Sequence, residues 1–527
     1  MILPTMPQET PIIIGVSDIK NYHSSNSLET AKEPLDLIHE AILGALLDAC
    51  APSGPSSLQS QIDGIDVVRT WTWPYPDLPG SLAEKLGVKE KVKWKAYSEH
   101  GGDKPGVLLD EAARKLAKGE GKVAVVCGGE ALASLTAYAK SGKIPPPGWT
   151  EPAEAIESVF SPTTRTLGEK NLGAIHKVGA PIHVYPMYEN AFRAHRGQTL
   201  KENHEESAEL YAEFSKIASE NEYAWNYGKY DDAKAIGTIG KNNRMICSPY
   251  PLLMNAFNTV NLASALILTT TTHARALNID PSKWIYPLGG AGTSEAATFW
   301  TRPNFHTSSA LTRSLDSALQ ISNTSMQQID LLDIYSCFPI VPKLAADHLG
   351  LPVVRGSKPL TLLGGLTSFG GAGNNYSMHA LTAMTRALRS GKGKKGLVLC
   401  NGGMLTYQFA IVLGTEPRSD GGGYTEKNPL EGVVCEELRE GVAEGAEASG
   451  EVIVETYTVE FHRSGAPLRG HIVARLKSNG KRVVANHAGE QTLRLLASGN
   501  SEVVGKAGWV TQDGERGLFT FGDIAAL

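Results

Sequence analysis

The chain alternates between short apolar runs of strand length and amphipathic stretches with helical spacing. Apolar strands are predicted at residues 11–15, 65–68, 122–127, 329–334 and 396–400, and helices at 35–50, 107–118, 311–321 and 376–389. Alternating strands and helices are typical of layered α/β domains. We therefore expect such layers to extend to about residue 415.

One unit of this pattern occurs twice. A glycine-rich loop at residues 367–375 runs directly into the helix at 376–389, and the following strand ends in Cys400-Asn401-Gly402-Gly403. Earlier, a loop at residues 98–105 leads to a helix and to a strand that ends in Cys127-Gly128-Gly129. The two copies indicate an internal duplication. The alternative is that α/β proteins commonly reuse such units.

The pattern also divides the chain. We assign residues 1–255 to a first half, with a helix-rich insertion at about 142–250, and residues 256–415 to a second half that opens with the apolar run 260–268. The insertion is expected to cover the α/β layers as a lid, or to be a solvated helical pair without ligand contact. Residues 416–430 have the composition of a linker. Residues 431–527 alternate short strands and turns, which predicts a small all-β, OB-like barrel.

Composition narrows the functional classes. The 527 residues contain 42% hydrophobic and 20% charged residues, as an ordinary globular protein does, and the net charge of −5 does not favour a nucleic-acid partner. No apolar run reaches membrane-spanning length, and the first residues lack a signal segment. The six cysteines (Cys50, Cys127, Cys247, Cys337, Cys400 and Cys435) have no metal-binding spacing. With an Ala-Ala-Leu end in place of a peroxisomal signal, we expect a cytoplasmic protein without a bound metal.

Several motifs together resemble the thiolase superfamily, over most of residues 10–415. Asp333-Ile334-Tyr335-Ser336-Cys337-Phe338 stands where thiolases carry Asn-Glu-Ala-Phe, or His-Asp-Cys-Phe in the sterol-carrier-protein type. The run 364–372 stands where they carry Gly-Gly and then Gly-His-Pro, and Cys400-Asn401-Gly402-Gly403 matches their Cys-x-Gly-Gly. The chain is most similar to thiolase-like proteins, acetyl-CoA acetyltransferase-like, with an extra C-terminal OB-like domain. The resemblance implies a duplicated thiolase-type α/β core.

The usual catalytic groups of that superfamily are largely replaced. The nucleophilic cysteine, which a helix N-terminus and a histidine activate in thiolases, falls on Gly101. The loop histidine falls on Gly371, and the Asn or His that binds the thioester oxygen falls on Tyr335. Only the second cysteine, Cys400, is retained. A thiolase that uses the ordinary nucleophile is therefore not expected.

Three residues remain as catalytic candidates. Cys400 is predicted to carry a perturbed thiol, although an inert buried cysteine is the alternative. His379 is a displaced base or a packing histidine. Tyr335 is an acid, a base or a donor to an enolate oxygen, or else a packed tyrosine. The residues expected to line the substrate site are Gly101, Gly102, Gly370, Gly371, His100 and Cys337, whereas Asp103 and Lys104 are interpreted as a solvated pair. We expect Gly101 and Gly371 to face each other across one cavity, with Cys400 at its floor.

Two kinds of function follow from the resemblance. The first is an acyltransferase acting on acyl-CoA thioesters, with coenzyme A as part of the substrate and no tightly bound cofactor. Its alternative is a thiolase-like aldolase or lyase on CoA thioesters, in which Tyr335 and His379 move protons. The second kind is a non-catalytic acyl-CoA-binding protein. The expected partner is a small acyl-CoA molecule, without nucleic acid or membrane, and a homodimer is compatible with the family.

Overall fold

Two mixed β-sheets of matching topology form the core of the structure, a computed structural model that describes residues 9–22, 28–49, 54–156 and 171–522. The first sheet has the strand order β1-β7-β4-β2-β3, and the second has the order β8-β11-β10-β9. Without the edge strand β3 the two orders correspond, which confirms the duplicated core. The strands are β1 (Pro11–Lys20), β2 (Ile62–Val67), β3 (Trp94–Tyr97), β4 (Val123–Ala131), β7 (Asn261–Thr270), β8 (Tyr286–Ser294), β9 (Leu331–Ile334), β10 (Lys395–Gly402) and β11 (Tyr407–Gly414).

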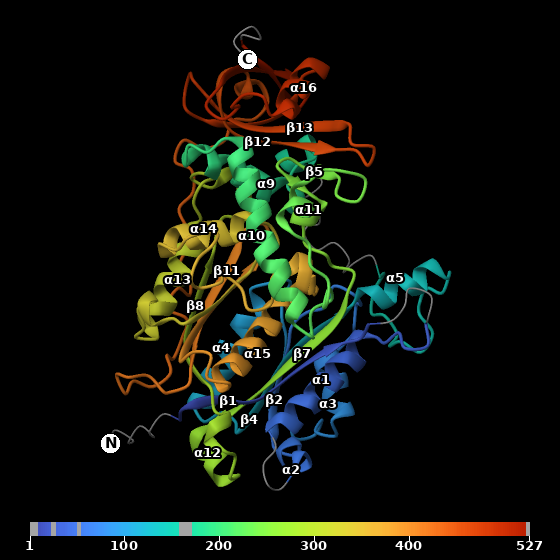
Figure 1. The fold of residues 1–527 in the computed structure, drawn as a ribbon, viewed down its shortest axis with the longest axis vertical. Coiled ribbons are helices and arrows are strands. Elements are labelled where there is room, and N and C mark those ends of the chain that lie inside the picture. The colour runs from blue at the N-terminus through green and yellow to red at the C-terminus, as the bar shows by residue number, and fades with distance from the viewer. Residues whose placement is uncertain (1–8, 23–27, 50–53, 157–170, 523–527) are drawn as a thin grey trace.

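Helices cover both faces of each sheet. Helices α4 (Lys104–Ala117) and α15 (Tyr376–Arg389) contact each other and lie between the two sheets (Figure 1). Helix α1 (Pro34–Ala49) covers the other face of the first sheet, and α13 (Ser309–Ile321) that of the second. Strands covered on both faces are buried along their whole length, as β4 and β7 are, and most of their residues are apolar or small. The helix predicted at 35–50 corresponds to α1, and Cys50 itself lies outside the described residues.

Strand β7 corrects the sequence analysis. The run 260–268 was assigned to the opening of the second half, but β7 pairs antiparallel with both β1 and β4 and so completes the first sheet. A local apolar pattern predicts the strand but not its partners, because hydrogen-bonded pairing joins residues far apart in the sequence. The second sheet begins with β8 instead.

The insertion between β4 and β7 consists mainly of helices, and it packs on the core. It includes α5 (Leu132–Lys140), α8 (Leu172–His176), α9 (Pro181–His195), α10 (Leu200–Glu220), α11 (Ala233–Gly237), β5 (Met245–Cys247) and β6 (Tyr250–Pro251). The Tyr185 hydroxyl donates to the carbonyl of Gly403, and that of Tyr211 to the carbonyl of Ser336. The insertion therefore covers the ends of β9 and β10, so its helices are not solvated on all sides.

The C-terminal region is a closed five-stranded barrel, as an OB-like domain is. Its strands pair in the order β13-β14-β16-β15-β12, and β12 pairs back with β13. Their bounds are β12 (Gly450–Phe461), β13 (Pro467–Leu476), β14 (Arg482–His487), β15 (Ala507–Asp513) and β16 (Arg516–Phe521). The sequence did not predict α16 (Glu490–Ser498), which follows β14 and has apolar residues at helical spacing.

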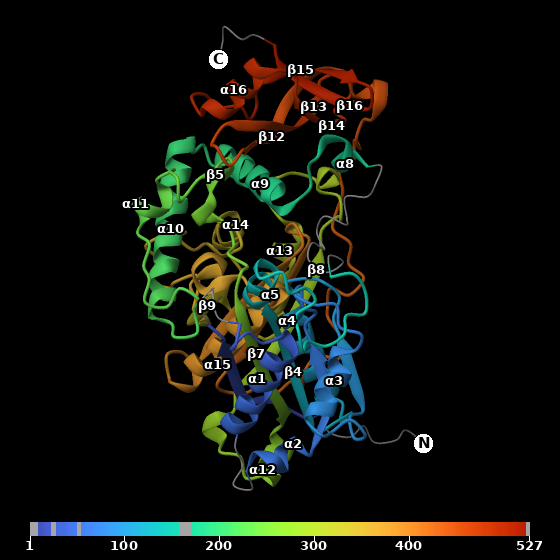
Figure 2. The ribbon, with the colours of Figure 1, turned by 90° about the vertical axis from the view of Figure 1, so that its right-hand side faces the viewer.

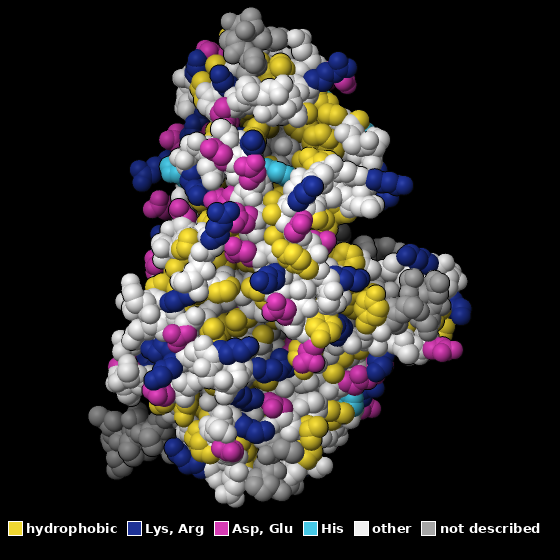
Figure 3. Space-filling model, in the orientation of Figure 1, with side chains coloured by type: hydrophobic (Ala, Val, Ile, Leu, Met, Phe, Trp, Pro, Cys, Tyr) yellow, Lys and Arg dark blue, Asp and Glu magenta, His cyan; other side chains and the backbone are white. Residues whose placement is uncertain are grey.

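The barrel rests on the insertion at one end of the molecule (Figure 2). Hydrogen bonds join α9 to β12: Asn190 Nδ2 donates to the carbonyl of Tyr457, and Thr456 Oγ1 to that of Met187. Basic and acidic side chains are interspersed over the face shown in Figure 3. Among the helices of the described ranges, none is long and apolar enough to cross a membrane.

Candidate active site

The two glycine-rich loops contact each other through Asn374 and Ser377 of the second loop. The Gly101 amide donates to Asn374 Oδ1 at 3.1 Å, and Ser377 Oγ donates to the carbonyl of Gly102 at 3.4 Å. The end of β10 reaches the same place, since a Cβ on Gly402 would lie 2.8 Å from the Gly102 amide nitrogen. Three glycines thus allow three backbone segments to come together where a larger residue would not fit.

Gly371 lies elsewhere in the second loop. Its amide donates to the carbonyl of Phe257 at 2.7 Å, and a Cβ there would meet Asn258 Oδ1 at 2.3 Å. Gly370, with φ of +115°, packs against Val260 and Trp225. Gly101 therefore meets the second loop through Asn374, and the expected facing pair of Gly101 and Gly371 has no support in these contacts.

The thiol of Cys400 is sealed within the core. Its residue is 0% exposed, and a Cβ built on Gly106 in the first turn of α4 would lie only 2.9 Å from its Sγ. Burial raises the pKa of Cys400 to about 12, although a hydrogen bond with Ser377 acts in the opposite direction. Burial likewise raises the pKa of Cys337 to about 12. Both thiols are therefore protonated near neutral pH and are weak nucleophiles.

Tyr335 follows β9 directly and borders the meeting point. Its hydroxyl would lie 3.0 Å from a Cβ on Gly102, and its ring packs edge-on against Tyr376 at 5.4 Å. Within the described residues the hydroxyl has no hydrogen-bond partner. Burial, followed by the influence of Cys337 and Cys400, raises the pKa of Tyr335 well above its usual value. The phenol thus stays protonated and is available as a donor.

His379 belongs to a different cluster. Its Nδ1 is paired with Asp18 of β1, whose other oxygen binds Arg386 at 2.6 Å, and its ring packs on Phe369. No contact between His379 and Cys400 is found in the described part of the chain. His100 Nδ1, by contrast, lies 3.1 Å from Asn374 Nδ2 at the edge of the loop junction. His100 is therefore near the junction, whereas His379 is engaged on the β1 side.

Asp103 corrects the interpretation of a solvated pair at the start of α4. It is 4% exposed, and its buried Oδ1 has no hydrogen-bond partner in the part of the chain that the structure describes, while Oδ2 binds Lys104 Nζ at 3.0 Å. A Cβ on Gly101 would lie 2.1 Å from Oδ1, and a Cβ on Gly402 would lie 2.7 Å away. Burial raises the pKa of Asp103, opposed by the Lys104 charge. Its position after two glycines was the only signal in the sequence.

Asn401 is a second residue that the sequence analysis did not single out. Its amide nitrogen donates to the Tyr185 hydroxyl at 2.9 Å, and its oxygen accepts from Gln408 Nε2 at 2.6 Å. The same amide lies 3.8 Å from Cys337 Sγ. Asn401 thus joins the end of β10 to helix α9 of the insertion, and α9 covers the residues around the loop junction.

A cavity of about 730 Å³ reaches this cluster from the outside at Asp103. It runs along α4 and the ends of β8 and β11, and its lining includes Lys104, Tyr407 and Phe409. Lys104 Nζ lies 5.5 Å from the centroid of the Tyr407 ring. A volume of this size is ordinary for a small-molecule site.

Comparisons with known proteins agree with this architecture. Residues 432–515 match the family model of the thiolase-like protein type 1 additional C-terminal domain. A monomeric SCP2-thiolase-like protein type 1 from Mycobacterium smegmatis has a similar structure, with a TM-score of 0.78 and 27% identity, over 97% of this chain and 99% of that one. The chain has a thiolase-like fold. No curated protein matches this thiolase-like protein.

More distant structures share the fold of the core. Human mitochondrial 3-ketoacyl-CoA thiolase is 13% identical with a TM-score of 0.54, over 77% of this thiolase-like chain and 99% of that one. The Ltp2-ChsH2(DUF35) aldolase is 17% identical with a TM-score of 0.55, over 78% and 98%. At these identities the likeness extends to the fold alone.

Proposed function

We propose that this protein is an enzyme that breaks or forms a carbon–carbon bond next to the carbonyl of an acyl-CoA thioester, by proton transfer and without a covalent acyl-cysteine. One observation carries the proposal. The buried Asp103 Oδ1, which has no hydrogen-bond partner among the described residues, and the Tyr335 hydroxyl border the glycines 101, 102 and 402. The neighbouring thiols, Cys337 and Cys400, have pKa values raised to about 12. This favours the aldolase-type reaction over the acyl transfer that the resemblance put first.

The groups suit a retro-aldol cleavage of a 3-hydroxyacyl thioester. The Asp103 carboxylate takes the proton of the 3-hydroxyl, the bond between C2 and C3 breaks, and its electron pair moves into the thioester as an enolate. The Tyr335 phenol, kept protonated by its raised pKa, donates a hydrogen bond to the enolate oxygen. Asp103 then returns the proton to C2. The products are an aldehyde or ketone and a shortened acyl thioester, so atoms and charge balance.

Support for a coenzyme A substrate comes from the fold. A human mitochondrial 3-ketoacyl-CoA thiolase of the same fold has been solved in complex with CoA. The lining of the cavity that reaches Asp103 mixes carboxylates such as Glu111 and Glu426 with lysines. Lys104, Lys118 and Lys427 are cations of the kind that bind phosphate groups. We propose that the acyl end enters along α4 and stops at Asp103 and Tyr335.

The test is turnover of a panel of 3-hydroxyacyl-CoA and 3-ketoacyl-CoA thioesters, followed by mass spectrometry of the CoA products. We expect cleavage of 3-hydroxyacyl-CoA by the unmodified protein, a loss of about 100-fold or more in Tyr335→Phe, and near-normal rates in Cys400→Ala. Tyr376→Phe, which removes the hydroxyl of the neighbouring tyrosine and keeps its ring, is the matched control. Acyl transfer that disappears in Cys400→Ala but survives in Tyr335→Phe would contradict the proposal, as would CoA binding without turnover of any thioester.

A further inference from the structure

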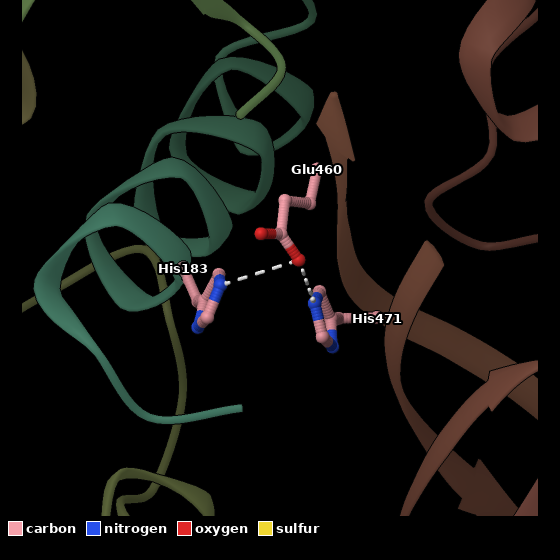
Figure 4. Close-up of side chains that lie close together, drawn as sticks. All are labelled: His183, Glu460 and His471. Carbon is pink, nitrogen blue, oxygen red and sulfur yellow. Dashed lines mark ion pairs between the residues drawn. The ribbon is translucent and has the colours of Figure 1, made fainter. Parts of the chain in front are cut away.

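Three side chains with metal-binding atoms meet where the insertion contacts the barrel. His183 lies on α9, Glu460 on β12 and His471 on β13, and one ligand atom from each lies within 4.8 Å of the other two. Figure 4 shows the two imidazole rings on either side of the Glu460 carboxylate. The residues come from elements almost 300 positions apart in the sequence, so only the fold brings them together.

The two histidines carry buried nitrogens that the protein leaves unsatisfied. His183 is 8% exposed and His471 is 0% exposed. Neither ring nitrogen of His183 has a hydrogen-bond partner in the described part of the structure, and neither does Nε2 of His471. Burial lowers the pKa of both rings. Neutral imidazoles with free lone pairs are the form that binds a metal ion.

The spacing is close to what a transition-metal ion needs. Nε2 of His183 and Nε2 of His471 each lie 3.9 Å from the same Glu460 oxygen, Oε2. A triangle with two sides of 3.9 Å and a third side at the 4.8 Å limit of this cluster has a circumradius of about 2.5 Å, and a shorter third side gives a smaller one. Zinc bonds to His and Glu are about 2.0–2.2 Å long, so a shift of a few tenths of an ångström would bring all three atoms into range.

Two neighbouring groups bear on the site. Arg469 Nη1 lies 3.8 Å from Glu460 Oε2 and competes for the carboxylate charge. Asn486 Nδ2 lies 3.2 Å from Nδ1 of His471 and also faces the carbonyls of His176 and Gly470. Coordination through Nε2 requires the proton of His471 on Nδ1, opposite the Asn486 amide nitrogen, which is a donor. Metal binding therefore requires the Asn486 side chain to turn its oxygen, which accepts from Arg516 Nε at 2.8 Å, toward Nδ1.

We infer that His183, Glu460 and His471 form a binding site for a divalent transition-metal ion of the zinc class, which joins helix α9 to the C-terminal barrel. Two imidazoles and one carboxylate are a common zinc ligand set, and the fourth position would be open to water. The ion would add a bond between the insertion and the barrel, where the direct contacts include hydrogen bonds from Asn190 and Thr456 and the ion pair of Arg193 with Glu502. This inference does not depend on the proposed catalytic function.

The experiment uses the full chain without a polyhistidine tag, stripped with a chelator and titrated with zinc chloride by isothermal calorimetry. We expect one zinc ion per chain and a melting temperature that rises with zinc concentration, because a ligand that binds only the folded state stabilises it. His183→Gln and Glu460→Gln should each weaken binding at least about tenfold, since even changes around a ligand weaken metal sites by 10–100-fold.

Controls separate the site from general effects. His204→Gln removes a histidine that binds the Gly237 carbonyl instead, and should leave the zinc stoichiometry unchanged. Arg469→Gln removes the competing cation, so zinc should bind at least as tightly as in the unmodified protein. Circular dichroism of each metal-free variant checks that it is folded. The inference fails if the folded protein binds no zinc saturably, or if His183→Gln and Glu460→Gln bind it as the unmodified chain does.

Discussion

The two halves of the core place different chemistry at the same structural position. Asp103 immediately precedes helix α4 in the first half, and Asn375 immediately precedes helix α15 in the second. Each side chain lies against a glycine at the strand end of the other half: Asp103 Oδ1 would be 2.7 Å from a Cβ on Gly402, and Asn375 Oδ1 would be 2.2 Å from a Cβ on Gly128. The duplication thus creates two contacts between the halves, each between the residue before a helix of one half and a glycine in a strand of the other. We call these contacts crossings: the Asp103 crossing has a carboxylate, and the Asn375 crossing has an amide.

The hydrogen bonds of Asn375 and Asp103 distinguish the crossing that stabilises the fold from the crossing that is suited to chemistry. Asn375 Nδ2 donates to the Gly128 carbonyl and to Ser264 Oγ, both at 3.0 Å. Its oxygen is also without a partner, but an amide oxygen does not take up a proton near neutral pH. Asp103 has a free carboxylate oxygen beside Tyr335 instead. We therefore assign a structural role to the Asn375 crossing and the proposed catalytic role to the Asp103 crossing.

Making the crossings alike should have the largest effect. Asp103→Asn keeps the size of the side chain but removes the base, so we expect turnover of the 3-hydroxyacyl thioester to fall by about 10²–10⁴-fold. The reciprocal change Asn375→Asp should give no new activity and should lower stability by about 1–3 kcal/mol, because it removes the donor of two buried hydrogen bonds. Steady-state kinetics and denaturant unfolding measure the two effects. Full activity in Asp103→Asn would remove the distinction between the crossings.

The first half also contains a buried carboxyl group with a structural role, Glu130 at the end of β4. It accepts hydrogen bonds from Thr70, Trp71 and Thr72, yet burial raises its pKa from 4.5 to about 7. The folded state thus disfavours the charged form. The free energy of unfolding should therefore fall as pH rises from about 4.5 to about 7, by about 3 kcal/mol from this group.

The substitution Glu130→Gln isolates that contribution. Asp110 and Asp333, whose pKa values are both raised to about 6, add to the slope in the unmodified chain, so the difference between the two proteins is the quantity to measure. We expect a shallower decline in stability between pH 4.5 and 7 in Glu130→Gln, measured by denaturant unfolding. An equal slope in both proteins would show that Glu130 titrates normally.

Adding a methyl group at either crossing should lower the stability of the fold, but only the methyl group at the Asp103 crossing should also lower the activity. Gly402→Ala and Gly128→Ala both place a Cβ under 3.0 Å from neighbouring atoms, so each should lose about 1–3 kcal/mol. Gly402→Ala should also lower the rate of cleavage, because it displaces Asp103 or the Gly102 backbone. Gly240→Ala is the matched control, since nothing lies within 4 Å of its added Cβ. Equal loss of activity in Gly402→Ala and Gly128→Ala would count against the distinction.

Replacing the cysteines at the two strand ends should have the smallest effect. Cys127 in β4 and Cys400 in β10 are both fully buried, and burial raises the pKa of each thiol. We expect Cys127→Ala and Cys400→Ala to leave the rate of cleavage within about threefold, since neither thiol takes part in the proposed proton transfer. A large loss of the rate in Cys400→Ala alone would favour acyl transfer as the function of the protein.

The sequence predicted the elements better than their partners. The repeated loop, helix and strand identified the duplicated core, because glycine spacing and apolar periodicity are local signals. Strand β7 was placed in the wrong half, since its pairing with β1 and β4 depends on residues far away. The OB-like barrel was predicted from the short strands and turn signals of residues 431–527, which are also local signals.

The candidate site was predicted less completely, for a related reason. Gly101, Gly102 and Tyr335 do come together, but the contact of Gly101 with the second loop is made by Asn374 and not by Gly371. Burial decides the chemistry of Asp103 and Cys400, and burial arises from segments that close over them. From the sequence alone, a charged residue that follows two glycines, such as Asp103, is predicted to be solvated. Only the structure shows that the end of β10 at Gly402 packs against it.

The most direct measurement of the central claim is exchange of the C2 hydrogens of acetyl-CoA or a longer acyl-CoA with deuterium oxide, followed by mass spectrometry. Exchange reports enolate formation without requiring the natural cleavage partner. We predict exchange in the unmodified protein and in Cys400→Ala, and its loss in Asp103→Asn and Tyr335→Phe. No exchange in the unmodified protein, or loss in Cys400→Ala alone, would contradict a reaction carried by the carboxylate and the phenol.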